Sequence, residues 1–178
     1  MYDYFYKVLL FRGPGVDISS LTPKSFLTPS FLSEITGENS IYTIGANGYS
    51  KTIVFDNMKI KLLIWDCSRE ERFREIMPSF AKGANGAIFI YNIVKYTVID
   101  ELQTWINEIK DSIRTEIDIF FPIVVFGNRS NLTQVNSKFH KLEGVNQFIE
   151  GYISTEETIK EAFTVLTRLM LSITNKNL

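Results

Sequence analysis

The residues best suited to chemistry follow an apolar run near the start of the chain. Loops that bind nucleotide phosphates follow the pattern G-x-x-x-x-G-K-[ST]. Its glycines let backbone N–H groups curl around the phosphates, its lysine neutralises them, and its hydroxyl binds Mg²⁺. Gly13 and Gly15 offer such a turn, while Ser19, Lys24 and Ser25 offer the hydroxyl and the cation. These residues are therefore candidates for binding a phosphate and its metal ion.

The phosphate-loop pattern can be aligned in two ways. Without a gap, Arg12 and Asp17 replace the two glycines and Ser19 keeps the hydroxyl. Asp17 would then hold a carboxylate among phosphate oxygens, where like charges repel strongly. With a gap, Lys24-Ser25 supplies the lysine and the hydroxyl, but Pro23 stands at a glycine and cannot donate an N–H. Either alignment predicts a damaged phosphate loop, and a surface turn that binds nothing is an equal alternative.

Composition and charge exclude several classes of function. The 178 residues are 45% hydrophobic and 22% charged, with a formal net charge of −1, so no basic surface for nucleic acid is expected. Cys67 is the single cysteine, which excludes an internal disulfide and suits a reducing cytosol. His140 has no cluster of metal ligands or nucleophiles around it in the sequence. Since no apolar run is long enough to span a membrane, we expect a cytoplasmic protein that reaches membranes peripherally, through a partner.

The periodicity of apolar residues predicts a single α/β domain over residues 1–178. Short apolar runs between turn residues predict strands, and apolar residues three or four apart predict helices. Strands that alternate with helices indicate a mostly parallel sheet. Asp56-Asn57 is a hairpin signal, Ser154 and Glu157 form a capping-box pattern, and residues 133–147 are expected to form a short helix and loops. The predicted strands cover Tyr4–Phe11, Lys51–Phe55, Lys59–Trp65, Ala87–Tyr91 and Pro122–Phe126, and the predicted helices cover Ile99–Ile113 and Ile159–Ile173.

Residues 61–105 contain a series of short motifs: Lys61-Leu62-Leu63-Ile64-Trp65-Asp66, Glu71-Arg72-Phe73-Arg74, Lys82-Gly83-Ala84, Ile88-Phe89-Ile90-Tyr91-Asn92 and Gln103-Thr104-Trp105-Ile106. In order and spacing this series resembles the switch II, fourth strand and third helix of a Rab protein, a branch of the Ras-superfamily small GTPases. Tyr42-Thr43-Ile44-Gly45 is similar to the end of switch I, and Gly127–Leu132 to the guanine-reading loop. The resemblance implies a P-loop NTPase-like small G domain. Such a domain has a six-stranded, mostly parallel sheet with helices on both faces, and its ligand loops lie at the carboxyl ends of the strands.

The resemblance also implies where a magnesium ion and a hydrolytic residue would lie. With GTP or GDP bound, Mg²⁺ would meet Ser19 or Ser25, Thr43 and, through water, Asp66. Lys24-Ser25 lies at the family's spacing before Thr43, whereas the ungapped alignment requires extra residues there. Glu70 stands where the family has the glutamine that orients the attacking water, and its carboxylate would face the charge of the phosphoryl group. We therefore expect no catalytic residue and slow or absent hydrolysis, with Mg²⁺ and nucleotide as cofactors only if the site is functional.

The guanine-reading loop resembles the family's Asn-Lys-x-Asp motif, with Asn128 at the first position and Arg129 at the second. Asn131 replaces the aspartate that accepts two hydrogen bonds from guanine. Because an amide offers one acceptor and a competing donor, one partner is mismatched, at a cost on the order of 1–3 kcal/mol. We expect reduced selectivity for guanine, and xanthine to be tolerated better.

Rab proteins carry an aromatic cluster between the switches that binds protein effectors. Here Gly48 and Ala81 stand at two of its positions and Trp65 alone keeps the aromatic ring. Contact and core roles are equally expected for Trp65, and the candidate partner-binding residues are Ile44, Trp65 and Phe73. The segment from Thr174 to Leu178 contains no cysteine that a prenyl group could modify, either because the sequence is truncated or because the protein does not anchor in membranes by this route.

Three functions compete at this point. The first is a Rab-like interaction module in vesicle trafficking or signalling, with impaired nucleotide binding and slow or absent hydrolysis. The second is a genuine but slow GTPase that uses Lys24-Ser25 or a compensating arginine. The third is a structural subunit whose switch surface is buried in a larger assembly. All three predict protein effectors or complex subunits as partners, and no nucleic acid.

Overall fold

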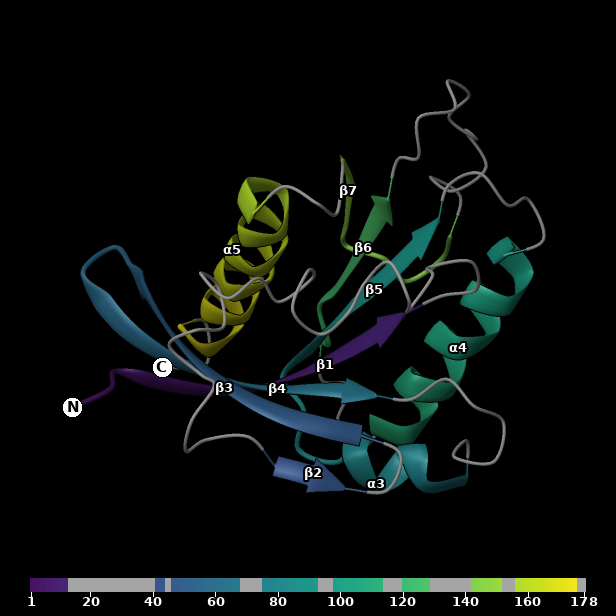
Figure 1. Cartoon of the computed structure of the whole chain (residues 1–178), viewed down its shortest axis with the longest axis horizontal. Helices are drawn as coiled ribbons and strands as arrows, with labels where there is room; N and C mark the ends of the chain where they lie inside the picture. Colours follow the sequence, from purple (N-terminus) through teal and green to yellow (C-terminus); the bar gives the residue numbers. More distant parts are fainter. Residues whose placement is uncertain are drawn as a thin grey trace.

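Strands and helices alternate along the chain, as the apolar periodicity predicts (Figure 1). The computed structural model describes residues 1–12, 41–43, 46–67, 75–92, 98–113, 120–128, 142–151 and 156–175. The strands are β1 (Tyr4–Arg12), β2 (Ile41–Thr43), β3 (Ala46–Phe55), β4 (Met58–Cys67), β5 (Gly86–Asn92), β6 (Ile123–Asn128) and β7 (Gln147–Gly151). The helices are α3 (Met77–Ala81), α4 (Val98–Ile113) and α5 (Glu156–Thr174).

The described strands form one sheet in the order β2-β3-β4-β1-β5-β6-β7. β1 pairs in parallel with β4 and with β5, and the parallel pairing continues from β5 to β6 and from β6 to β7. Only the pairs β2–β3 and β3–β4 are antiparallel. The prediction of a mostly parallel sheet is therefore confirmed, and the three-residue edge strand β2 adds to the six strands expected.

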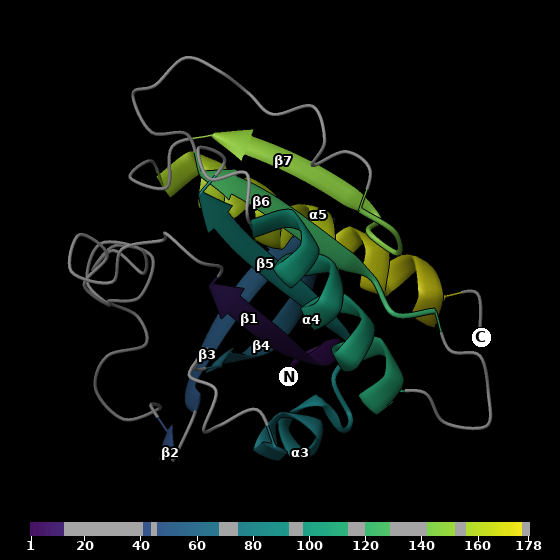
Figure 2. The same cartoon turned by 90° about the vertical axis from the view of Figure 1, so that its right-hand side faces the viewer.

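Helices cover both faces of the sheet and make two layers of core (Figure 2). Val8 and Leu10 of β1 belong to the layer under α5, together with Phe163 and Leu166 of that helix. Leu9 and Phe11 point to the opposite layer, which includes residues of α3 and α4. This alternation follows from the two-residue repeat of a strand whose two faces are both buried.

The hairpin between β3 and β4 forms where the sequence predicts it. Asp56 and Asn57 have φ angles of 48° and 64°, the left-handed values that a two-residue hairpin turn with right-handed strand twist requires. In β4, Ile60, Leu62 and Ile64 are buried, whereas Lys61 and Leu63 between them are half-buried. The hairpin therefore carries Trp65 and Asp66 at its far end, close to the candidate site.

Three elements were not located by the periodicity of apolar residues. β2 has only three residues, α3 has five, and β7 has a single buried residue, Ile149, in the sequence Gln-Phe-Ile-Glu-Gly. β7 occupies the end of residues 133–147 and continues beyond it, and of that stretch residues 133–141 lie outside the described part. Ser154 also lies outside it, so its capping box stays a prediction. No helix within the described ranges is long and apolar enough to cross a membrane.

Candidate functional site

The ends of the parallel strands bring polar residues to one edge of the sheet, here called the carboxyl edge. β1 ends at Arg12, β6 ends at Asn128, and Asp66 is the penultimate residue of β4. The main chain of Thr43 lies at the same edge, because Thr43 pairs with Ala46 and Ala46 pairs with Cys67. Open α/β sheets bind ligands outside the carboxyl ends of their strands. Asp66, Asn128 and the main chain of Thr43 therefore lie along this one edge, and their binding roles stay predictions.

An ion pair between Arg12 and Asp66 dominates the described part of this edge. Arg12 donates a hydrogen bond from Nε to Oδ1 of Asp66 at 3.0 Å and another from Nη2 to Oδ2 at 2.8 Å. Because Leu10 is the register partner of Asp66 in the β1–β4 pair, Arg12 lies two residues further along the same face and within reach. The side chains of Arg12 and Asp66 are only 21% and 9% exposed, so water screens this two-point contact poorly.

Burial shifts the pKa of two neighbouring groups. It raises the pKa of the Asp66 carboxyl above its usual range, because desolvation disfavours the charged form, and the Arg12 guanidinium offsets part of that rise. Burial also raises the pKa of the Cys67 thiol to about 12, helped by the Asp66 carboxylate and opposed by Lys7. A buried thiol of this kind is not a nucleophile near neutral pH.

Trp65 is half-buried between the sheet and α3. Its register partner in β3 is Gly48, which has no side chain to place directly beside the indole. Ala81 is fully buried. The ring of Phe80 lies 5.4 Å from that of Trp65. The Lys7 ammonium lies 5.9 Å from the indole centroid and donates a hydrogen bond to the Lys82 carbonyl oxygen at 2.8 Å. The indole Nε1 is buried and has no hydrogen-bond partner within the described residues. Trp65 therefore packs partly against the core, and its contact with partners stays a prediction.

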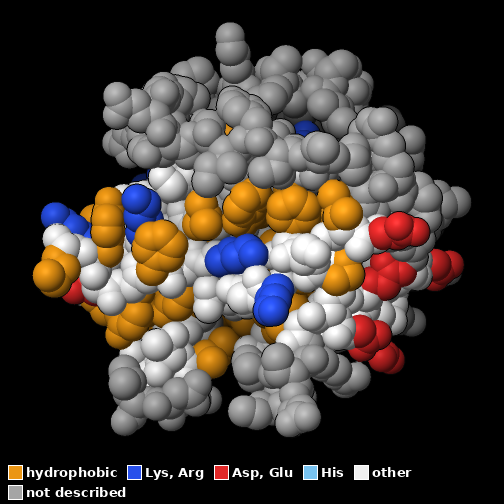
Figure 3. Space-filling model, turned by 90° about the horizontal axis from the view of Figure 1, so that it is seen from below, with side chains coloured by type: hydrophobic (Ala, Val, Ile, Leu, Met, Phe, Trp, Pro, Cys, Tyr) orange, Lys and Arg blue, Asp and Glu red, His pale blue; other side chains and the backbone are white. Residues whose placement is uncertain are grey.

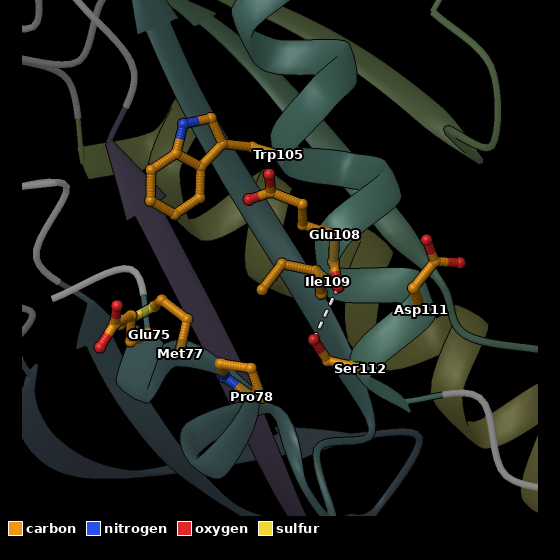
Figure 4. Close-up of a pocket in the computed structure, with 8 residues that line it drawn as sticks. All are labelled: Glu75, Met77, Pro78, Trp105, Glu108, Ile109, Asp111 and Ser112. Carbon is orange, nitrogen blue, oxygen red and sulfur yellow. Dashed lines mark hydrogen bonds between the residues drawn. The ribbon is translucent and has the colours of Figure 1, made fainter.

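A second feature is a cavity of about 500 Å³ between α3 and α4 (Figure 4). Trp105 closes one end, and the Ser112 hydroxyl donates to the backbone carbonyl of Glu108 at 2.7 Å. Carboxylates surround an apolar floor, which gives the cavity a negative rim. The lining residues are Glu75, Met77, Pro78, Trp105, Glu108, Ile109, Asp111 and Ser112.

The remaining predicted site residues lie outside the described part of the chain, and their roles stay predictions. The phosphate-loop candidates among them are Gly13, Gly15, Ser19, Lys24 and Ser25. Glu70 stands at the position of the catalytic glutamine, Ile44 and Phe73 are partner-binding candidates, and Arg129 and Asn131 belong to the guanine-reading loop.

Two residues at the site were missed by sequence reasoning. Arg12 was considered only as a replaced glycine, although its place at the end of β1, parallel to the strand that carries Asp66, could have predicted the ion pair. Phe80 is the second, because the family's aromatic position aligns with Ala81 and not with Phe80. One residue before that position, Phe80 supplies the ring that contacts Trp65.

Comparison with known proteins agrees with this architecture. The sequence model of the Ras family matches residues 19–172. The chain is 32% identical to "GTP-binding protein ypt3" of Schizosaccharomyces pombe, covering 99% of this chain and 81% of that protein. It is 30% identical to "Ras-related protein rab-11.1" of Caenorhabditis elegans, covering 99% and 82%. The chain belongs to the Ras family of small GTPases, and within it is Rab-like.

Members of this family generally bind Mg²⁺ together with GTP or GDP, so the fit of Asp66 to that role can be judged. A carboxylate that steers a hydrated Mg²⁺ must accept hydrogen bonds from metal-bound water. Here both Asp66 oxygens already accept from Arg12. Asp66 is the partner of an ion pair, and the adjacent Arg12 guanidinium fits poorly with a divalent cation at the same carboxylate, because the two positive charges repel.

Proposed function

We propose that the chain acts as a Rab-like interaction module in vesicle trafficking or signalling, with impaired guanine-nucleotide binding and slow or absent GTP hydrolysis. The observation that carries this proposal is a continuous strip of side chains on β1 and β4, formed by Phe5, Lys7, Lys61, Leu63 and Trp65. It is called here the interswitch strip.

Strand pairing alone builds the interswitch strip. The parallel register pairs Phe5 with Lys61 and Lys7 with Leu63, so these side chains share one face with Trp65. Phe5 is 59% exposed, and Lys61 lies with its ammonium 6.0 Å from the Phe5 ring. Exposed aromatic and basic side chains on a rigid sheet are suited to protein contacts. On the side of the molecule where β2 and α3 lie, hydrophobic and basic side chains are interspersed (Figure 3).

The residue types of the nucleotide motifs support the second half of the proposal. Glu70 replaces the glutamine that orients water, and Asn131 replaces the aspartate that reads guanine. A carboxylate beside the developing phosphoryl charge slows hydrolysis, and a mismatched amide weakens base recognition. Both replacements would weaken the binding or the hydrolysis of the nucleotide, and neither residue belongs to the interswitch strip.

Thermal shift with nucleotides tests the nucleotide half. A ligand present at a concentration equal to its dissociation constant stabilises by about 0.4 kcal/mol, which is about 1–2 °C for a chain of this size. With millimolar GDP, GTP or XTP and Mg²⁺, we expect shifts no larger than this. Shifts well above it with GDP or GTP would contradict impaired binding.

The chain's two tryptophans provide a matched test of the partner half. Trp65→Ala removes one of the two aromatic rings of the interswitch strip, whereas Trp105→Ala truncates the same residue type on α4, beside the cavity. We expect proteins recovered by affinity purification of the wild-type chain to be lost with the first variant and kept with the second. Equal loss with both variants, at equal folded content by circular dichroism, would argue against the strip.

A slow GTPase is the second candidate, and the position of Asn128 favours it. Asn128 lies at the carboxyl edge where a guanine-reading loop would begin. Calorimetry of GDP and GTP binding to the wild type and to Lys24→Ala separates the two candidates. Tight binding that the substitution abolishes would support the GTPase and the gapped alignment, whereas weak binding to both supports the interaction module.

A further inference from the structure

The ion pair at the carboxyl edge joins two residues that the family uses separately. In the ungapped alignment Arg12 stands at the first glycine of the phosphate loop, and Asp66 stands at the aspartate that steers Mg²⁺. The structure brings them together through two hydrogen bonds, at 3.0 and 2.8 Å. A side chain of this chain therefore lies against the carboxylate that elsewhere serves a metal ion.

The charge balance at Asp66 follows from this contact. A carboxylate attracts a divalent cation through its negative charge, but the adjacent guanidinium already balances that charge at close range. Mg²⁺ gives up its water reluctantly and needs ordered oxygen ligands. A hydrated Mg²⁺ approaching Asp66 would meet the positive guanidinium and a carboxylate whose two oxygens each already accept one hydrogen bond from Arg12. The site thus disfavours the metal through charge, because the guanidinium repels the ion and balances the carboxylate that would attract it.

Arg12 also keeps hydrogen-bonding capacity of its own. A guanidinium carries five N–H donors, and the described contacts use one at Nε and one at Nη2. Arginine suits phosphate because its planar group presents several donors together with a permanent charge. The guanidinium is partly exposed, with 21% of the Arg12 side chain accessible. One residue can therefore hold Asp66 and also offer positive charge to an anion.

We propose that Arg12 is a resident cation that takes the place of Mg²⁺ at Asp66, so that any di- or triphosphate bound at the carboxyl edge is bound independently of magnesium. This inference goes beyond the proposed function, because it concerns the metal and holds for weak and for tight nucleotide binding alike.

The test uses the full chain and two probes, GDP and Mn²⁺, which replaces Mg²⁺ and is visible by electron paramagnetic resonance. For the wild type, the dissociation constant of GDP should differ by less than roughly twofold between excess Mg²⁺ and excess chelator. Mn²⁺ should show no protein-bound signal, with or without GDP. A tightening of tenfold or more by Mg²⁺, or a bound Mn²⁺ centre in the wild type, would overturn the inference.

Arg12→Gly restores the family's residue and frees Asp66. This variant should acquire a bound Mn²⁺ signal or at least a roughly tenfold dependence of GDP affinity on Mg²⁺, and Arg168→Gly on α5 serves as the arginine control. A folded Arg12→Gly protein that gains neither property would overturn the inference. If this variant does not fold, the Mn²⁺ measurement on the wild type still decides.

The outcomes also separate this inference from the proposed function. Tight but magnesium-independent GDP binding would refute impaired nucleotide binding and support the role of Arg12. Weak GDP binding that nevertheless tightens tenfold with Mg²⁺ would support impaired nucleotide binding and refute the role of Arg12.

Discussion

Replacement of Arg12 by methionine tests how strongly the ion pair holds the carboxyl edge together. The substitution keeps a long side chain but leaves the Asp66 carboxylate, which is 8% exposed, without its cation. Removal of one partner from a buried ion pair typically costs about 3–5 kcal/mol. Because the Arg12 side chain is 21% exposed, water can replace part of the contact, and we expect about 2–3 kcal/mol.

The assay is denaturant and thermal unfolding followed by circular dichroism. A loss of about 2–3 kcal/mol corresponds to a melting temperature lower by about 4–12 °C for a chain of this size. Arg168→Met is the control, since Arg168 is exposed on α5 and, among the described residues, its side chain makes a ring contact with Phe55 at 5.8 Å and no ion pair. We expect that variant to lose less than about 1 kcal/mol.

A second substitution distinguishes the lost pair from lost packing. In the double variant Arg12→Met, Asp66→Leu no buried charge is left behind, and such replacements are often neutral or stabilising. Most of the stability lost by Arg12→Met should therefore return. A single variant as stable as wild type, or a double variant no more stable than the single one, would refute the reasoning.

Two further predictions concern the core around the site. Gly86→Ala should lower the free energy of unfolding by about 1–3 kcal/mol in denaturant titrations, because an added Cβ would lie 2.9 Å from Leu166 Cδ1 and 3.1 Å from the Pro122 carbonyl oxygen; wild-type stability would contradict this close packing. Cys67 should resist iodoacetamide in the native protein at pH 8 and react only on unfolding. Because the pKa of the Cys67 thiol is about 12, the fraction present as thiolate is on the order of a thousandfold below that of an ordinary thiol. Rapid labelling of the folded chain would contradict the burial of Cys67.

Much of the fold was predictable because its central strands are buried on both faces. Runs such as Tyr4–Phe11 and Pro122–Phe126 are apolar whatever their neighbours, so their type is visible in the sequence alone. β7 could not be found in this way. Its five residues contain one buried side chain, and it exists because β6 offers it a parallel partner. The same is true of β2, which pairs only with β3.

For the described residues of the candidate site, the sequence predicted the position in the sheet but not the contacts. The motifs placed Asp66 and Asn128 correctly at strand ends, because parallel strands share one carboxyl edge. The pairing of Arg12 with Asp66 depends on the register of β1 against β4, residues separated by more than fifty positions, which no local pattern encodes. Phe80 similarly reaches Trp65 only through the packing of α3 against the sheet.

The most direct test of the central claim is the nucleotide content of the native protein. The chain would be purified with Mg²⁺ present throughout and then denatured, and the released nucleotide would be quantified by ion-exchange chromatography. We predict far less than one equivalent of GDP or GTP, because we propose that the residue changes in the nucleotide motifs, such as Glu70 and Asn131, impair guanine-nucleotide binding. A stoichiometric yield of guanine nucleotide would contradict that account.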